Sequence, residues 1–321
     1  MIMSAAAESK TEGMPMQCCA SCGVAEIDDI KLKDCDGCDL VKYCSDACQE
    51  DDRLQHKEEC EKRAAELHDE LLFKQPESTH HGDCPICCLP IPIDPSKSTL
   101  YSCCCKRICK GCSHANQKRQ LEGRLEPKCP FCRTAAAKTK GEINEFLMKR
   151  IEANDPVAMC SMGKEKYQEG DYKSAFEYAT RAVALGDTEA HYQLGHVEAH
   201  YGLSILYQHG QGVEKDTKKE LYHAEQAAIG GHPEARHNLG CIEEENGRVD
   251  MALKHWVIAA KLGFDKSLET VKNLYKAGFA SKDDFTAALR GYQTVFVAAK
   301  SPQREEAAKF AKWEAEHNHL L

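Results

Sequence analysis

The stretch LSILYQHGQGVEKD at residues 203–216, followed by AAIGGHPEA at residues 227–235, decides the fold of the second half of the chain. Related segments recur along the sequence: ARHNLG at Ala235 matches AHYGLS at Ala199, an offset of 36 residues. A period in this range is typical of a helical solenoid. A single helix pair cannot bury its apolar face, so about three or more pairs have to stack.

Two further alignments give a shorter period of 32 residues: AMCSMG at Ala158 matches AHYQLG at Ala190, and GHPEA ending at Ala235 matches GFDKS ending at Ser267. Each unit has a second helix that ends in Ala and Gly, where Gly suits the left-handed residue that terminates a helix. These segments resemble Sel1-like repeats, relatives of the TPR family, over residues 155–278. The resemblance implies an α-solenoid that acts as an adaptor for protein partners.

The repeat contains one irregularity. EAHYQLG at Glu189 returns as EAHYGLS at Glu198, nine residues later. Nine residues turn a helix by about 900°, so the two copies are half a turn out of phase. Because Leu203 and Leu206 fit the downstream repeat, we expect a mis-phased helical extension or a bulge over residues 190–197.

The histidines of the solenoid segment are scattered and are not paired like metal ligands. We expect them to be surface or groove residues without a metal role: His191, His200, His209, His223, His232 and His237.

Composition limits the classes of protein. The chain has 321 residues, 42% of them hydrophobic, and a net charge of −9, which argues against bulk nucleic-acid binding. No apolar run reaches the ~18 residues of a membrane span. The opening MIMSAAAESKTEGMPM lacks the basic flank and apolar core of a secretory signal. We therefore expect a cytoplasmic or nuclear protein, where thiols stay reduced.

The chain has 20 cysteines, and only Cys160 and Cys241 lie beyond residue 133. In a reducing compartment, clustered CxxC pairs indicate metal binding rather than disulfides. No phosphate-loop, dinucleotide-binding or HExxH motif is present, so the sequence offers no catalytic residues.

The first cysteine cluster supplies eight soft ligands in order, which fill two tetrahedral zinc sites with none missing. They are Cys19, Cys22, Cys35, Cys38, Cys44, Cys48, His56 and Cys60. Residues 18–60 resemble a MYND finger, including the Tyr-Cys pair at Tyr43 and the HKEEC ending. The resemblance implies one zinc on the first, second, fifth and sixth ligands and another on the remaining four. Cys18 could replace Cys19, but only Cys19 has CxxC spacing.

MYND fingers generally bind proline-rich peptides, and many carry Trp three residues before the histidine. Arg53 stands there in this chain. The peptide ligand of the finger, and whether the finger binds one, are therefore open.

The second cluster lies in residues 83–133 and contains SCCCKRICKGC at residues 102–112. Lys106, where many such fingers have histidine, cannot ligate as an ammonium, but four thiolates satisfy Zn²⁺ equally well. The pattern CPIC with CPFCR resembles a RING finger. All-cysteine RINGs place a ligand at the position of Cys104, and its partner is Cys103, with Cys105 as the alternative. The expected ligands are Cys84, Cys87, Cys109 and Cys112 on one zinc, and Cys103, Cys104, Cys129 and Cys132 on the other.

RING ubiquitin ligases hold a ubiquitin-charged conjugating enzyme, the E2. The resemblance implies E2 contacts through an apolar residue in the first CxxC, here Ile86, and the proline of the last pair, here Pro130. A cation just beyond the last cysteine, here Arg133, would bridge E2 and ubiquitin, a role that suits a guanidinium. The Trp frequent between the third and fourth pairs is absent. The alternative is a non-enzymatic scaffold in which both fingers and the solenoid bind protein partners.

We thus expect a mainly α protein with two small cross-brace zinc fingers, MYND then RING, followed by an α-solenoid of Sel1-like repeats, and four zinc ions, two per finger. The expected segments are a disordered 1–17, a MYND-type finger 18–60, a helical linker 61–82, a RING-type finger 83–133, a linker 134–154, a solenoid 155–278 and a C-terminal helical cap and tail 279–321.

Overall fold

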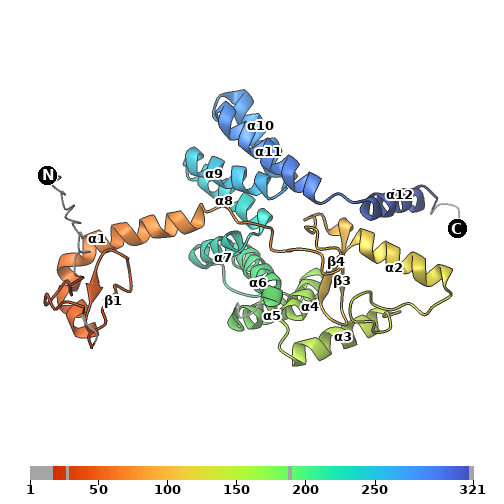
Figure 1. Cartoon of the computed structure of the whole chain (residues 1–321), viewed down its shortest axis with the longest axis horizontal. Helices are drawn as coiled ribbons and strands as arrows, with labels where there is room; N and C mark the ends of the chain where they lie inside the picture. Colours follow the sequence, from red (N-terminus) through yellow and green to blue (C-terminus); the bar gives the residue numbers. More distant parts are fainter. Residues whose placement is uncertain (1–16, 27–28, 187–189, 318–321) are drawn as a thin grey trace, which may run out of the picture. The chain divides into compact units, whose positions relative to one another are not determined.

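The computed structural model describes residues 17–26, 29–186 and 190–317. The chain divides into two compact units, residues 1–72 and residues 73–321 (Figure 1). Twelve α-helices and two short sheets occur in the described ranges, which confirms the mainly α fold class. The expected disordered segment 1–17 lies, apart from Gln17, outside the described residues.

The first unit has a two-stranded antiparallel sheet, β1 (Lys33–Asp34) and β2 (Lys42–Tyr43), followed by α1 (Asp46–Leu72). Tyr43 is 2% exposed, and its hydroxyl donates to a carboxylate oxygen of Asp52 in α1 at 2.8 Å, which joins sheet and helix. The segment 61–82 was expected to be a helical linker. Its helical part is a continuation of the helix that carries the last finger ligands, and this helix ends at Leu72.

The second unit begins with the other cysteine cluster. A 3₁₀ turn, η1 (Pro95–Lys97), leads into β3 (Ser98–Tyr101), which pairs antiparallel with β4 (Lys106–Cys109) and is followed by α2 (Lys110–Glu122). Tyr101 lies opposite Lys106, so the three consecutive cysteines 103–105 form the reversal between the two strands.

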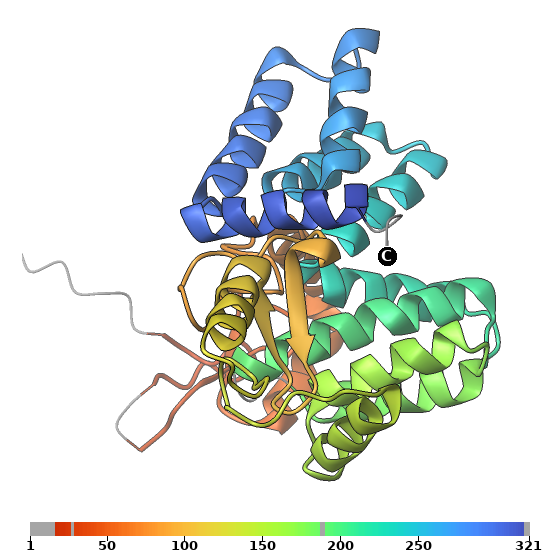
Figure 2. The ribbon, with the colours of Figure 1, turned by 90° about the vertical axis from the view of Figure 1, so that its right-hand side faces the viewer.

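Ten further helices of the described ranges complete this unit. The three pairs α4/α5, α6/α7 and α8/α9 make the most extensive helix contacts of the described chain and stack on one another as a solenoid (Figures 1 and 2). After α3 (Lys140–Glu152) come α4 (Pro156–Gln168), α5 (Tyr172–Ala184), α6 (Ala190–His209), α7 (Thr217–Ile229), α8 (Pro233–Glu245), α9 (Val249–Lys261), α10 (Asp265–Ala277), α11 (Lys282–Ala298) and α12 (Pro302–His317).

Small residues at repeated places bring the paired helices together. A Cβ added to Gly240 in α8 would lie 2.5 Å from the indole nitrogen of Trp256 in α9, so only glycine allows this approach. Trp256 is 1% exposed, and its indole N–H donates to the carbonyl of His237 at 3.2 Å. The large ring therefore fills the space that the glycine leaves, with its polar group satisfied.

Helix α6 carries the expected irregularity as a helical extension. It runs as one helix from Ala190 to His209, so residues 190–197 form no bulge. Leu194 joins the core around α4, whereas Leu203 and Leu206 pack with Ala179 of α5. The half-turn offset is therefore present, and α6 has neighbours on both faces. Glu189 and the side chains of residues 190–193 lie outside the described part.

Two other segments differ from the expected layout. Residues 134–154, expected to be a linker, include α3, which packs against α4 and extends the helical stack by one helix. Residues 279–321, expected to be a C-terminal helical cap and tail, have a second role. Their last helix, α12, leaves the solenoid and packs along α2 of the second cysteine cluster (Figure 2). No helix in the described ranges has both the length and the apolar character needed to cross a membrane.

Candidate metal centres

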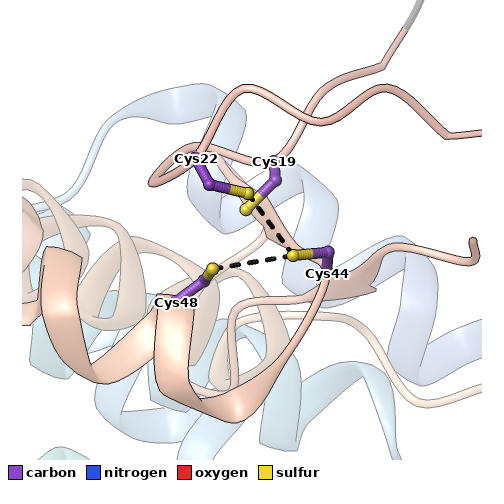
Figure 3. A group of neighbouring side chains, drawn as sticks. All are labelled: Cys19, Cys22, Cys44 and Cys48. Carbon is purple, nitrogen blue, oxygen red and sulfur yellow. Dashed lines mark hydrogen bonds between the residues drawn. The ribbon is translucent and has the colours of Figure 1, made fainter.

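Four cysteines of the first unit meet beside the start of α1 (Figure 3). Cys19 and Cys22 belong to a tight turn closed by the bond from the Cys19 N–H to the Val24 carbonyl at 2.8 Å. Cys44 follows β2, and Cys48 lies in the first turn of α1. The Cys44 sulfur lies 3.5 Å from that of Cys22 and 3.6 Å from that of Cys48.

These separations identify the kind of site. Two sulfurs bound to one tetrahedral zinc ion at ~2.3 Å are separated by about 3.8 Å. Two sulfurs in a disulfide are only about 2.05 Å apart. The distances of 3.5 and 3.6 Å therefore suit a shared ion, and every described cysteine is a free thiol.

The charges of this group also require a cation. The backbone N–H of Cys22 lowers the pKa of the Cys19 thiol to about 6, which favours its thiolate. The neighbouring Cys22 side chain raises the pKa of the Cys44 thiol to about 12, because a second negative charge is unfavourable there. A divalent cation removes this repulsion and lets all four thiols ionise, so the donor set fits zinc.

The second group of the first unit is built from a turn and a helix face. Cys35 and Cys38 lie between β1 and β2, while His56 and Cys60 are four residues apart on α1 and so share one side of it. The Cys38 sulfur is 3.1 Å from the Nε2 atom of His56, and the Cys35 sulfur is 3.8 Å from that of Cys60. A Cβ on Gly37 would lie 2.8 Å from the Cys60 sulfur, so the turn approaches this ligand too closely for any side chain.

The third group joins the first CxxC pair of the second cysteine cluster to the CxxC pair in its middle. Its members are Cys84, Cys87, Cys109 and Cys112. The turn after Cys84 is closed by its N–H bonding to the Leu89 carbonyl at 3.0 Å, and Cys109 stands at the end of β4 as the N-cap of α2. The sulfurs of Cys87 and Cys109 are 3.8 Å apart.

Arg304 of α12 reaches this third group from the far end of the sequence. Its guanidinium donates to the carbonyls of Leu89 at 3.1 Å and Pro90 at 2.7 Å, and one N–H lies 3.6 Å from the Cys87 sulfur. A cation at this distance stabilises a thiolate ligand and fixes the loop that carries it. Sequence reasoning missed Arg304, since nothing near it in the sequence marks a zinc site.

The fourth group contains two of the three consecutive cysteines, Cys103 and Cys104, together with the last CxxC pair. The sulfur of Cys103 is 3.4 Å from that of Cys132, and the sulfur of Cys104 is 3.8 Å from that of Cys129. Cys105 is fully buried away from the group, in the core formed with Leu147 and Ile151 of α3. The structure thus brings together the pair that the sequence favoured and places its alternative elsewhere.

The comparisons with known proteins bear on the first unit. The family model of the MYND finger matches residues 19–60. Residues 19–60 are a MYND finger. The chain accordingly binds zinc through the cysteine and histidine groups of this MYND finger. No curated protein sequence matches the chain significantly.

Two solved structures resemble the chain. A Sel1 repeat protein from Oxalobacter formigenes is 22% identical, with a TM-score of 0.41, over 58% of this chain and 71% of that one. A protective antigen of uropathogenic Escherichia coli strains with an SLR fold is 25% identical, with a TM-score of 0.37, over 49% of this chain and 33% of that one. The assignment of a solenoid is based on the helix pairs of this chain and not on these two structures.

The expectation of surface or groove positions was wrong for several histidines. His200 is 3% exposed, and its Nδ1 atom lies 2.8 Å from that of His223, so one ring donates a hydrogen bond to the other in the interior. Burial lowers the pKa of His200 to about 3. His232 is 5% exposed and caps α8. Pattern reasoning failed here because each partner lies on a different helix.

Proposed function

We propose that this chain is a zinc-dependent adaptor for protein partners and that its second cysteine cluster is a RING-type finger that recruits a ubiquitin-charged E2. MYND fingers and Sel1-like repeats generally mediate protein–protein interactions, so the adaptor role needs only the modules already described. The ligase role requires the second cluster to hold two zinc ions, which makes four in the chain. In this proposal the solenoid presents the client to be modified.

The observation that carries the ligase proposal is the exposure of the residues that a RING finger uses for E2. Ile86 is 42% exposed although it lies inside a CxxC turn, and Arg133 is exposed beside the last ligand. Pro130 is half-buried, and the residue that follows it, Phe131, is 44% exposed. Exposed apolar side chains on a small finger favour a protein-binding role for that surface.

Helix α12 covers the finger without covering these residues. It contacts α2 through His114, whose ring lies 4.8 Å from that of Phe310, and through Lys118, which pairs with Glu306 at 2.7 Å. The E2-contact positions inferred from the RING resemblance are therefore accessible while the C-terminal helix is docked. Docking of α12 is compatible with the proposed activity.

The proposed mechanism is positional. Each zinc would be held by four protein ligands, so it has no open position for water and performs no chemistry itself. Ile86 would bury its side chain in the E2 interface. The Arg133 guanidinium, with its planar set of donors, would bond E2 and ubiquitin together and hold the thioester in a reactive orientation.

Discharge of ubiquitin from a panel of charged E2 enzymes tests this proposal. The wild-type chain should accelerate discharge with at least one E2 and modify itself. Arg133→Ala should retain its zinc and lose activity, because charge-assisted bonds of ~1.5–3 kcal/mol each are removed. Ile86→Ala should weaken E2 capture, since burial of its side chain contributes roughly 1.5–3 kcal/mol. Cys129→Ser should lose both zinc and activity.

The second candidate is a non-enzymatic scaffold, and one observation favours it. The segment between the last two CxxC pairs, residues 113–128, has no tryptophan to complete an E2 groove. A scaffold predicts that no E2 in the panel binds and that Arg133→Ala changes nothing measured. Activity that survives both Arg133→Ala and Ile86→Ala would place the E2 contact elsewhere and remove the support for the RING assignment.

The peptide specificity of the MYND finger is part of the same proposal. A shallow cleft on this finger is lined by Gln17, Ala20, Leu40 and Lys42, among others, and offers a place for an extended peptide. Arg53, at the usual tryptophan position, is exposed and pairs with Glu50 at 3.1 Å. Arg53 is not among the residues that line the cleft, so we infer that a peptide bound there would contact Leu40 and Lys42 instead of an indole ring.

A further inference from the structure

Three histidines and one glutamate converge where the segment preceding the second finger crosses the solenoid. The Nε2 atom of His80 lies 3.0 Å from a carboxylate oxygen of Glu198 in α6, and the Nε2 atom of His81 lies 3.8 Å from the same oxygen. The ring of His232, in the turn between α7 and α8, stacks on that of His80 at 4.3 Å. One ligand atom each of His80, Glu198 and His232 lies within 4.8 Å of the others.

The crossing is a tight backbone contact. The N–H of His80 donates to the Gly231 carbonyl at 3.1 Å. A Cβ on Gly231 would lie 2.7 Å from the carbonyl oxygen of Ser78, and its φ of +84° also favours glycine. The histidines are therefore held against the solenoid by the main chain, so their position does not depend on the side-chain cluster alone.

The hydrogen-bond partners of the two histidines define the charge that this cluster needs. The Nδ1 atom of His80 lies 3.4 Å from the Gly231 carbonyl, and the Nδ1 atom of His81 lies 3.4 Å from the Pro92 carbonyl. Both nitrogens of each ring thus face oxygen acceptors. A neutral imidazole has one N–H, so in the tautomer whose Nδ1 donates to the carbonyl, the Nε2 lone pair faces the Glu198 carboxylate. Either a second proton on the ring or a metal ion between the two groups removes this repulsion.

The surroundings favour the metal ion. The side chains of His80 and His81 are 4% and 6% exposed. A histidine that donates Nδ1–H to a backbone carbonyl and directs Nε2 inward has the orientation usual for metal-bound histidine. Glu198 is 29% exposed, which leaves a path for an ion.

We propose that His80, Glu198 and His232 bind a divalent transition-metal ion of zinc-like donor preference. Nitrogen and oxygen ligands ~2.0–2.1 Å from one tetrahedral ion are about 3.3 Å apart, close to the 3.0 Å between His80 and Glu198. His232 accepts the Ala235 N–H at 3.2 Å through Nδ1, so its Nε2 atom is the one available to a metal ion. The ion would fasten the segment before the second finger to α6 and α8.

Native mass spectrometry of the full zinc-loaded chain tests this proposal by counting ions on each molecule. Glu198→Gln keeps the size of the side chain but removes the charge that a metal requires, and His80→Gln removes a ligand. Each should carry one ion fewer than the wild type. The matched control is His209→Gln, which changes an exposed histidine at the end of the same helix α6 and should leave the count unchanged.

The experiment measures the difference in the number of bound ions between each variant and the wild type, and the expected difference is one. The result therefore does not depend on how many ions the cysteine groups hold or on any ligase activity. Circular dichroism checks that each variant keeps its helices, and two different substitutions guard against one that fails to fold. Equal counts in the wild type and in a folded Glu198→Gln or His80→Gln variant would overturn the proposal and leave a His80–Glu198 ion pair. Loss of one ion in the His209→Gln control would also overturn it.

Discussion

Replacement of Arg304 by lysine should release α12 from the second cysteine cluster, which is called the second finger below. The Arg304 guanidinium reaches the finger through the carbonyls of Leu89 and Pro90 and also holds the carbonyl of Ala299 at 2.8 Å in its own segment. These three oxygens lie in different directions, and a planar group with five N–H donors can satisfy them together. The ammonium of lysine donates all its hydrogen bonds from one nitrogen atom. It can therefore reach about one of the two carbonyls of Leu89 and Pro90.

The size of the effect follows from these contacts. A hydrogen bond to a charged donor contributes ~1.5–3 kcal/mol. Arg304 is half-buried, so we take a value near the lower end, about 2 kcal/mol, for the bond that lysine loses. Because 1.4 kcal/mol is a factor of ten, detachment of α12 should become roughly 30-fold more frequent. Hydrogen exchange of the α12 amides, followed by mass spectrometry, should accelerate by about that factor.

Glu306→Gln is the matched control on the same helix. It removes the Lys118–Glu306 pair, whose side chains are 51% and 54% exposed, and exposed pairs of this kind contribute about 0–1 kcal/mol. The hydrogen-exchange rate of the α12 amides should then rise less than about fivefold. If Arg304→Lys exchanges like the wild type, or if Glu306→Gln has the larger effect, the reasoning that Arg304 anchors this helix is refuted.

Three other changes have defined outcomes. Gly37→Ala places a Cβ 2.8 Å from a ligand sulfur, so a chelator should remove zinc from the MYND finger faster, whereas Gly202→Ala has no atom within 4 Å and should leave zinc retention unchanged. Cys104→Ala should lose one zinc by metal analysis and Cys105→Ala none, and the reverse result would exchange their roles. Burial lowers the pKa of His200 from 6.5 to about 3, so the unfolded chain binds more protons below pH 6.5. Stability should fall as the pH is lowered, and His200 alone should contribute about 1.4 kcal/mol of that loss at pH 5.5. The wild type should therefore lose about that much more than a His200→Gln variant in thermal unfolding, and equal losses would contradict this.

The parts of the fold that could be predicted from sequence depend on local patterns. Ligand spacing such as Cys35-x2-Cys38 is a property of one turn, and the i,i+4 relation of His56 and Cys60 is a property of one helix. The helix pairs were also predictable, because Gly240 and the matching small residues recur at a fixed period. The RING resemblance favoured Cys103 over Cys105 as the partner of Cys104, and these two are the cysteines that face the last CxxC pair.

What could not be predicted involves partners that are distant in sequence. Arg304 lies 217 residues from Cys87, and no pattern near either residue connects them. The cluster of His80 and Glu198 spans 118 residues and forms only once the segment before the finger crosses α6. The burial of both faces of α6 has the same cause: a helical pattern shows which residues are apolar, but the neighbours that cover them are set by tertiary packing.

The zinc count of the cysteine groups tests the central claim most directly. In the Glu198→Gln chain, which lacks the proposed histidine–glutamate ion, native mass spectrometry should find four zinc ions, one for each of the four groups whose sulfurs and imidazole nitrogen come together in the structure. A count of two would restrict zinc to the MYND finger, and the cross-braced second finger and the ligase proposal built on it would be contradicted.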